Sequence, residues 1–239
     1  MATVLQISDT HLRAAPHTPA DMDPDESLLA TIDAVRGVRA DLVLLTGDLA
    51  DDGSLAALQR LRAVVDDLST PLLAVAGNHD DLDNVRRMFG IADTIEVGRW
   101  RVMGVESIIP GQDHGSVDVE KLIERLDRLD DRPTLMAIHH PPRSPSTNPL
   151  FQLIGADALL AALRDRPHVR AIVSGHLHEV FDRREGDLRI YGGPSSWYAI
   201  EHIGDDYRMF TDGLVGAQVL TLGDDGSFAC NRVSRSLGC

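Results

Sequence analysis

Short, largely apolar runs that end in small or metal-binding residues recur along the chain as far as residue 178. The run 71–76 is apolar throughout and is followed at once by Gly77-Asn78-His79-Asp80. An uninterrupted apolar run of this length is typical of a central strand covered on both faces. Similar runs at 4–7, 42–45, 135–138 and 169–173 precede Asp9-Thr10-His11, Gly47-Asp48, His139-His140 and Gly175-His176-Leu177-His178. The pattern predicts buried strands that each carry polar side chains at one end.

Between these runs, apolar residues recur at helical spacing. Helices are predicted at about 25–38, 55–68, 82–89, 118–129 and 156–164. Asp23 or Asp25 can cap the first helix, and Asp51 and Asp52 precede the second. Two strands at 94–97 and 100–105 are predicted to form a hairpin. Strands that alternate with helices in this way predict an α/β fold.

Beyond residue 178 the pattern changes to short β runs separated by turn signals. These runs lie at 180–183, 188–191, 197–203, 207–210, 215–222 and 227–232. We expect these strands to be antiparallel and to extend or cover the sheet. Because no linker divides the chain, we predict a single domain over 1–239, with an alternating α/β part to about 178 and a mainly β part over about 179–239.

The composition is typical of a globular protein, since 43% of the 239 residues are apolar. No window approaches the roughly 18 uninterrupted apolar residues that a membrane span needs. The sequence passes from Met1 directly into a strand, so we expect no integral membrane segment and a cytoplasmic location. Cys230 and Cys239 are too few for a disulfide framework and are expected to be free thiols.

The formal net charge of -14 argues against a nucleic acid polymer as partner, because no basic stripe is present to neutralise a phosphate backbone. A small anionic substrate remains compatible with this charge. Bound divalent cations can invert the local field that the net charge produces.

The polar side chains after the predicted strands are expected to converge, because ligands in open α/β sheets lie beyond the carboxyl ends of the strands. The candidate metal ligands are Asp9, His11, Asp48, Asn78, His139, His176 and His178. This set is too large for one tetrahedral zinc ion and suits two ions that share a bridging carboxylate. Oxygen and imidazole donors without a thiolate are compatible with manganese or iron and do not exclude zinc.

In order and type, these motifs resemble the signature of the calcineurin-like metallophosphoesterase superfamily, and within it the class III cyclic-nucleotide phosphodiesterases, whose relatives include bacterial glycerophosphodiesterases. The resemblance implies a four-layer α-β-β-α sandwich of two mixed sheets with two divalent or mixed-valence metal ions, of iron, manganese or zinc. It further implies that Asp48 bridges the ions. One ion would be held by Asp9, His11 and His178, and the other by Asn78, His139 and His176.

The activity that the resemblance implies is hydrolysis of a small anionic phosphodiester by a hydroxide that bridges the two ions. Cyclic nucleotides, 3′,5′-cAMP or 2′,3′-cAMP, are the first candidates. Glycerophosphodiesters or nucleotide pyrophosphates are the alternatives within the same enzyme class. A metal-free scaffold that binds protein partners is the alternative of another class. A homodimer is expected only by analogy with relatives.

Four further residues have expected roles beside the metal ions. His79 is expected to protonate the leaving group or stabilise the transition state, with Asp80 either fixing its tautomer or capping the next helix. Asn78 and His79 are expected to contact substrate. His140 is expected to contact substrate or to support a ligand, and Arg13 to meet a phosphate oxygen or to be solvated.

The remaining features carry no readable specificity signal. Trp197 and Tyr198 are predicted to stack on a base, to form a dimer contact or to pack in the core. The loops 13–24, 107–117 and 143–154 are expected to shape substrate choice. The other histidines are expected to be surface or packing residues, with His17 the one that could also touch substrate; they are His17, His114, His168 and His202.

Overall fold

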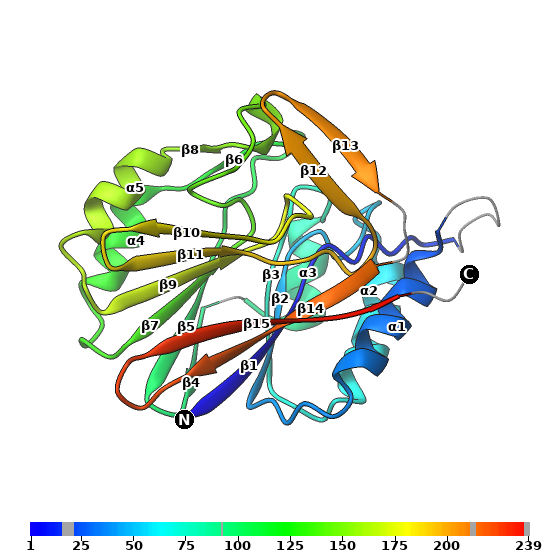
Figure 1. The fold of residues 1–239 in the computed structure, drawn as a ribbon, viewed down its shortest axis with the longest axis horizontal. Helices are drawn as coiled ribbons and strands as arrows, with labels where there is room; N and C mark the ends of the chain where they lie inside the picture. Colours follow the sequence, from blue (N-terminus) through cyan, green and yellow to red (C-terminus); the bar gives the residue numbers. More distant parts are fainter. Residues whose placement is uncertain (16–21, 92, 211–213, 237–239) are drawn as a thin grey trace.

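The computed structural model describes residues 1–15, 22–91, 93–210 and 214–236. Two central sheets face each other, and helices cover their outer sides (Figure 1). Both sheets contain parallel and antiparallel neighbours, so the expected four-layer α-β-β-α sandwich of two mixed sheets is confirmed.

The first sheet has the strand order β15-β14-β1-β2-β3. Its strands are β1 (Ala2–Ile7), β2 (Leu42–Thr46), β3 (Leu72–Val75), β14 (Leu214–Leu222) and β15 (Phe228–Ser236). The first three are parallel, and the helices α1 (Pro24–Val35), α2 (Leu55–Asp66) and α3 (Leu82–Phe89) follow them in turn. The carboxyl ends of β1, β2 and β3 therefore lie at one edge of this sheet.

The second sheet has the order β10-β11-β9-β7-β5-β4. Its strands are β4 (Thr94–Val97), β5 (Trp100–Val105), β7 (Thr134–Ile138), β9 (Val169–Ser174), β10 (Phe181–Glu185) and β11 (Leu188–Gly192). Strands β5, β7 and β9 are parallel, and α4 (Val119–Leu126) and α5 (Ala156–Leu163) connect them. The hairpin of β4 and β5 has the predicted bounds.

The unbroken apolar runs follow from burial on both faces of each sheet. In β2, Val43 and Leu45 pack toward the helices, while Leu42 and Leu44 pack between the two sheets. Strand β7 repeats this alternation, with Ala137 between the sheets. Every position of such a strand is buried, so the sequence shows no polar alternation.

The mainly β part of the chain supplies strands to both sheets. The expectation that its strands are all antiparallel was wrong for β11, which pairs parallel with β9. The turn at 186–187 joins β10 and β11 in an antiparallel hairpin. Strand β10 runs opposite to β9 without pairing with it. The hairpin then brings β11 back between these two strands, antiparallel to β10 and parallel to β9. Strands β12 (Ala199–Ile203) and β13 (Asp206–Phe210) form a separate hairpin.

Two loops expected to be irregular contain short regular elements. Strands β6 (Gly115–Ser116) and β8 (Leu153–Ile154) pair in parallel, and a 3-10 helix η1 spans Pro149–Phe151. The loops 107–117 and 143–154 are thereby joined to each other beside the ends of the central strands.

Helix starts depend on side-chain caps that the sequence located within a few residues. Asp23 caps α1 as predicted, whereas α2 is capped by Ser54 rather than by the preceding aspartates. Asp81, not Asp80, caps α3. Asp80 is therefore free for another role.

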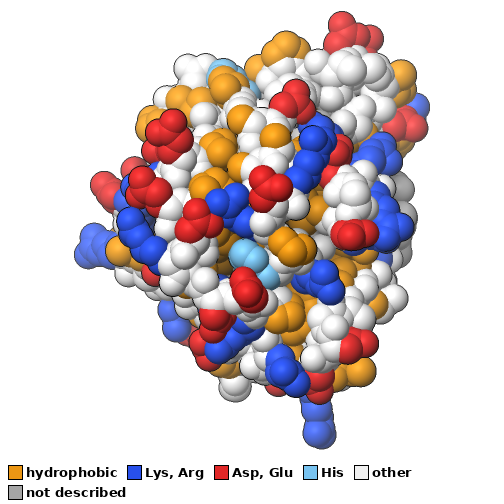
Figure 2. Space-filling model, turned by 90° about the vertical axis from the view of Figure 1, so that its left-hand side faces the viewer, with side chains coloured by type: hydrophobic (Ala, Val, Ile, Leu, Met, Phe, Trp, Pro, Cys, Tyr) orange, Lys and Arg blue, Asp and Glu red, His pale blue; other side chains and the backbone are white. Residues whose placement is uncertain are grey.

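No helix within the described ranges is long and apolar enough to cross a membrane. On the face shown in Figure 2, acidic and basic side chains are interspersed and neither sign forms a continuous patch. This face offers no basic track for a phosphate backbone.

We predict that Leu44→Ala lowers the free energy of unfolding by about 2–5 kcal/mol, because Leu44 is fully buried between the two sheets. Leu29→Ala is the control, since Leu29 lies on α1 and is 55% exposed, and its effect should stay within about 0.5 kcal/mol. Urea titration followed by circular dichroism measures both. Equal losses of unfolding free energy in the two variants would contradict the burial of Leu44 between the two sheets.

Candidate active site

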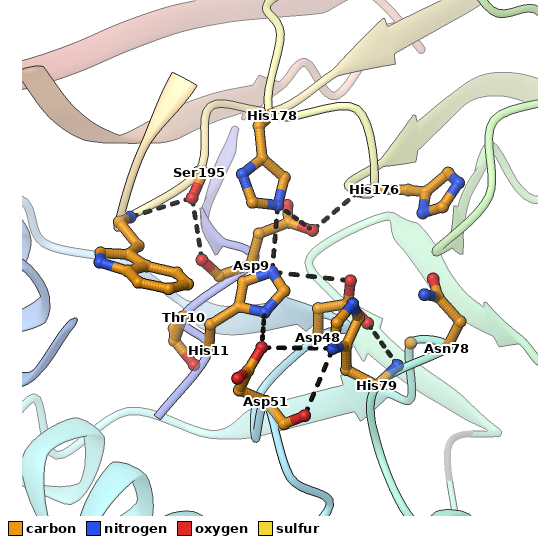
Figure 3. Close-up of polar contacts among 12 residues, drawn as sticks. Asp9, Thr10, His11, Asp48, Asp51, Asn78, His79, His176, His178 and Ser195 are labelled. Carbon is orange, nitrogen blue, oxygen red and sulfur yellow. Dashed lines mark hydrogen bonds and ion pairs between the residues drawn. The ribbon is translucent and has the colours of Figure 1, made fainter. Parts of the chain in front are cut away.

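The polar blocks predicted from the sequence meet at one place, beyond the carboxyl ends of β1, β2 and β3 in the first sheet and of β7 and β9 in the second (Figure 3). They line a cleft of about 180 Å³. Its polar wall contains His11, Asp48, Asn78, His79, His176 and His178. The residues span the chain from 9 to 178, so the fold alone brings them together.

The backbone at the site is held in an unusual conformation. Among the described residues, six that are not glycine have φ in the left-handed region, and all but Ser69 are predicted ligands: Asp9, His11, Asp48, His176 and His178. This conformation is unfavourable for residues with a side chain and persists only where the surrounding structure enforces it. Its concentration here indicates a site built for function.

The first group of donors surrounds His11 and His178. Their Nε2 atoms lie 3.1 Å apart, Asp48 Oδ2 is 3.7 Å from His11 Nε2, and Asp9 Oδ1 is 3.6 Å from His178 Nε2. His178 Nδ1 donates to the carbonyl of Tyr198, and His11 Nδ1 lies 3.0 Å from Asp51 Oδ1. When both rings are neutral, their Nε2 lone pairs therefore face each other. Such a contact is repulsive unless a cation lies between the rings.

The second group of donors surrounds His139. Its Nε2 lies 3.1 Å from Asn78 Oδ1 and 3.3 Å from Asp48 Oδ2, while its Nδ1 donates to the carbonyl of Thr46. The ring of His176 lies 5.1 Å from that of His139. His176 Nε2 donates to the carbonyl of Leu150, which leaves Nδ1 as its lone-pair nitrogen. Asp48 Oδ2 is thus within reach of both groups.

Buried charge in the cleft also fits cations. Burial raises the pKa of Asp9 to about 6, even though His139 opposes the shift. For Asp48, burial acts in the same direction, but attraction to His139 and His11 holds its pKa well below the usual range. Burial alone would lower the pKa of His139, whereas Asp48 and Asp9 raise it to about 9. The carboxylates therefore require nearby positive charge.

One orphaned atom supports the same conclusion. Asp9 Oδ2 is buried and has no hydrogen-bond partner, whereas Asp9 Oδ1 accepts from the backbone N–H of His176. A buried carboxylate oxygen without a partner is costly, and a metal ion would satisfy it. Carboxylate, amide and imidazole donors together fit one or two first-row divalent cations.

Three glycines permit the strand ends to approach this closely. A Cβ atom at Gly77 would collide with Asp48, and one at Gly175 would lie 2.7 Å from Asp9 Oδ2 and 2.9 Å from the carbonyl oxygen of Thr46. Gly47 similarly faces His139. A side chain at any of these three positions would therefore displace a predicted ligand.

His79 pairs with Asp51, not with Asp80 as expected. Its Nδ1 lies 3.2 Å from Asp51 Oδ1 and 3.3 Å from the Asp51 carbonyl oxygen. The hydrogen bond to Asp51 raises the pKa of His79 to about 9, which favours the protonated ring. Asp51 also contacts His11 and accepts from Arg13 Nε at 2.7 Å. One carboxylate therefore orients a predicted ligand and a predicted proton donor.

Asp80 has a different environment from the one expected. Its carboxylate accepts hydrogen bonds from the backbone N–H groups of Leu49, Ala50 and Gly77. It thereby ties the loop after β2 to the loop after β3. The residue contacts neither the ring of His79 nor the start of α3, because the turn after Gly77 directs it inward, toward the end of β2.

His140 and Arg13 have partners other than substrate. His140 is buried, with Nδ1 2.8 Å from Ser107 Oγ and Nε2 3.0 Å from the carbonyl of Asp113. It holds the loop 107–117 beside the cleft. Arg13 pairs with Asp51 and lies over the ring of Trp197 at 5.8 Å, so it is not simply solvated.

Several functional contacts were not foreseen. Ser195 Oγ donates to the Asp9 carbonyl at 2.9 Å and fixes the segment that carries Trp197 and Tyr198 (Figure 3). Trp197 lies 5.4 Å from the ring of His11, and Tyr198 lies 4.4 Å from that of His178. Both aromatic residues thus lie beside histidines that are predicted ligands. The surplus of carboxylates after β2 was the signal that could have identified Asp51.

His202 and His168 have partners of their own, and His17 lies outside the described residues. His202 packs against Phe151 with ring centroids 4.5 Å apart, and His168 lies beside Asp131. His17 and part of the loop 13–24 fall outside the described residues. The substrate contact considered for His17 is therefore untested.

Comparison with known proteins assigns the class. The model of the family described as calcineurin-like phosphoesterase matches residues 2–180. The chain belongs to this family of metallophosphoesterases. It is 34% identical over 237 residues to the 3′,5′-cyclic adenosine monophosphate phosphodiesterase CpdA of Pseudomonas aeruginosa, a match that covers 93% of this chain and 86% of the relative.

Two further comparisons agree with this assignment. The CpdA phosphodiesterase of Escherichia coli strain K12 is 30% identical over 247 residues, covering 92% of this chain and 90% of the relative. A dimetal phosphatase from Danio rerio has a TM-score of 0.65 with 12% identity, and 98% of each chain is covered. At that identity, the structural match concerns the fold alone.

We predict that Gly175→Ala lowers the free energy of unfolding by about 1–3 kcal/mol, because the added methyl group would collide with Ser8 and crowd Asp9. Gly37→Ala is the matched control, since nothing lies within 4 Å of the methyl group it would add. Chemical denaturation measures both variants. A Gly175 variant as stable as the Gly37 variant would show that the strand ends do not approach this closely.

Proposed function

We propose that this protein is a metal-dependent phosphodiesterase that hydrolyses 3′,5′-cyclic nucleotides, with 3′,5′-cAMP as the first substrate to test. The observation that carries the proposal is the position of Asp48 Oδ2, which lies 3.7 Å from His11 Nε2 and 3.3 Å from His139 Nε2. One carboxylate oxygen shared by two donor groups is the arrangement that a pair of cations requires. The names of the relatives support the substrate class.

The two donor groups define how the cations would be held. Asp9, His11 and His178 would hold one ion, and Asn78, His139 and His176 the other, with Asp48 between them. Iron and manganese suit this mixed set of oxygen and imidazole donors, and zinc is compatible with it. When bound, such ions supply Lewis acidity and lower the pKa of coordinated water.

The residues around this centre would act on the substrate and its leaving group. Asn78 and His79 line the cleft beside Asp48, where a phosphate group would lie. His79 lines the cleft with its side chain 40% exposed, and its contact with Asp51 favours the protonated ring, so it would donate its Nε2 proton to the departing oxygen. The carboxylate of Asp51 contacts Nδ1 of His79, and this contact fixes the orientation of the ring.

Chelation and substitution of the predicted ligands test the metal centre. The purified protein should contain about two metal ions per chain, and chelation should abolish hydrolysis of 3′,5′-cAMP until Mn²⁺ is restored. Asp48→Ala and Asn78→Ala should lose metal and turnover together. Asp165→Ala is the control, because Asp165 is an exposed carboxylate outside the cleft. Elemental analysis and a product assay measure both quantities, and near-full activity in the Asn78 variant would contradict the assignment.

Replacement of His79 tests its role as the proton donor. His79→Ala should keep both metal ions and lower kcat for 3′,5′-cAMP by about 100- to 10,000-fold, because an alkoxide leaves poorly without a proton. The loss should be much smaller for bis(p-nitrophenyl) phosphate, whose p-nitrophenolate leaves without protonation. Equal losses on the two substrates would assign His79 to charge stabilisation instead.

Assays on several substrates distinguish 3′,5′-cyclic nucleotides from the alternative phosphodiester substrates. Parallel assays on 3′,5′-cAMP, 2′,3′-cAMP and glycerophosphocholine compare the two phosphodiester classes. One relative, named probable glycerophosphodiester phosphodiesterase GpdQ of Arcobacter nitrofigilis, is 28% identical over 196 residues. Faster turnover of glycerophosphocholine than of either cyclic nucleotide would replace the proposed substrate class with the glycerophosphodiesters.

A further inference from the structure

The hairpin of β12 and β13 stands apart from the two main sheets (Figure 1). Three of its residues line the cleft: Ile200, Tyr207 and Met209. Its register pairs Ile200 with Met209 and His202 with Tyr207. Because side chains alternate along a strand, these four residues share one face of the hairpin. That face is directed at the cleft, since Ile200, Tyr207 and Met209 line it.

The opposite face of the hairpin points to solvent. Ile203 is 61% exposed, and Arg208 lies over the ring of Phe210 at 4.6 Å. Tyr207 and Met209 face inward, yet they remain 48% and 53% exposed. Their exposure arises because they border open space in the cleft rather than packed protein.

The cleft consequently has two chemically different ends. The polar end holds the donor groups around Asp48, and the apolar end is lined by Leu150, Phe151, Ile200, Tyr207 and Met209. Tyr207 packs edge-on against Phe151 with ring centroids 5.3 Å apart. A molecule that fills both ends needs an anionic group at one end and a flat or apolar group at the other.

The hairpin is fixed in place by contacts at both of its ends. At its base, the backbone N–H of Ile200 donates to the carbonyl of His178, a predicted ligand. At its tip, the carbonyl of Gly204 accepts from the N–H of Thr147, and Asn148 Nδ2 donates to the carbonyl of Asp205 at 2.8 Å. The apolar wall is therefore held at a set position relative to the polar end.

We propose that the inward face of this hairpin, together with Phe151, binds the base of a nucleotide phosphodiester. This inference rests on the proposed function and names the part of the cleft that selects nucleotides. The ribose separates the base of a nucleotide from its phosphate, so the base can meet the apolar lining while the phosphate meets the polar lining, which adjoins it where Phe151 lies 5.5 Å from the ring of His176. Aromatic and thioether side chains accept any base by its face, so the wall selects a base without reading its hydrogen-bonding edge.

The test compares binding of 5′-AMP with binding of ribose 5-phosphate, which lacks the base. Titration calorimetry on the manganese-loaded enzyme gives both dissociation constants for the wild type, Tyr207→Ala, Met209→Ala and Tyr207→Phe. Ile203→Ala is the matched control, because Ile203 lies on the outward face of the same hairpin. The kcat/KM ratio of 3′,5′-cAMP to glycerophosphocholine is the second readout.

We expect the wild type to bind 5′-AMP more tightly than ribose 5-phosphate by roughly five- to a hundred-fold, the contribution of one stacked base. Tyr207→Ala and Met209→Ala should reduce this preference and the kcat/KM ratio, Tyr207→Phe should retain most of it, and Ile203→Ala should leave it unchanged. Circular dichroism and metal content establish that each variant is folded and loaded.

Three outcomes would overturn the inference. The first is an unchanged preference for 5′-AMP in the alanine variants. The second is a selective loss of glycerophosphocholine turnover, which would identify the wall as an ammonium-binding cage. The third is a fall in oligomeric mass without a change in binding, which would identify it as a subunit contact. By contrast, a wild type that hydrolyses no phosphodiester would contradict the proposed function itself.

Discussion

The carboxylate of Asp48 is the group on which the rest of this structure depends. It is buried, and its Oδ2 atom lies between His11 from the first sheet and His139 from the second. Its Oδ1 atom accepts from the backbone N–H of His79. One carboxylate can be surrounded in this way only because the two sheets bring the carboxyl ends of their parallel strands to the same place. The sandwich can thus be understood as the frame that brings these donors together.

This cluster of donors lowers the free energy of unfolding. Two buried aspartates, predicted ligands in left-handed backbone conformations and converging imidazole nitrogens all cost free energy. Three apolar clusters offset this cost, one between the sheets and one beneath the helices on each side. Cations bound by the donors would relieve the remaining electrostatic cost. Stability and metal binding should therefore be coupled in this protein.

Much of the fold and of the donor set could be predicted from the sequence, because both depend on local patterns. Apolar runs such as 42–45 identify strands buried on both faces, and the residues after parallel strands must share an edge. The partners of these residues were harder to predict. Asp80 is adjacent to His79 in sequence, yet the backbone turn directs it away, and Asp51 from the preceding strand end lies beside His79 instead. The place of β11 and the inward face of the β12–β13 hairpin similarly depend on tertiary packing that local patterns do not encode.

The central claim is that two cations share Asp48. Anomalous diffraction from crystals of the manganese-loaded protein tests it most directly, because it locates each ion independently of the protein atoms. The account predicts two peaks about 3.5–4 Å apart with the Asp48 carboxylate between them. A single peak, or two peaks of which only one contacts Asp48, would contradict it.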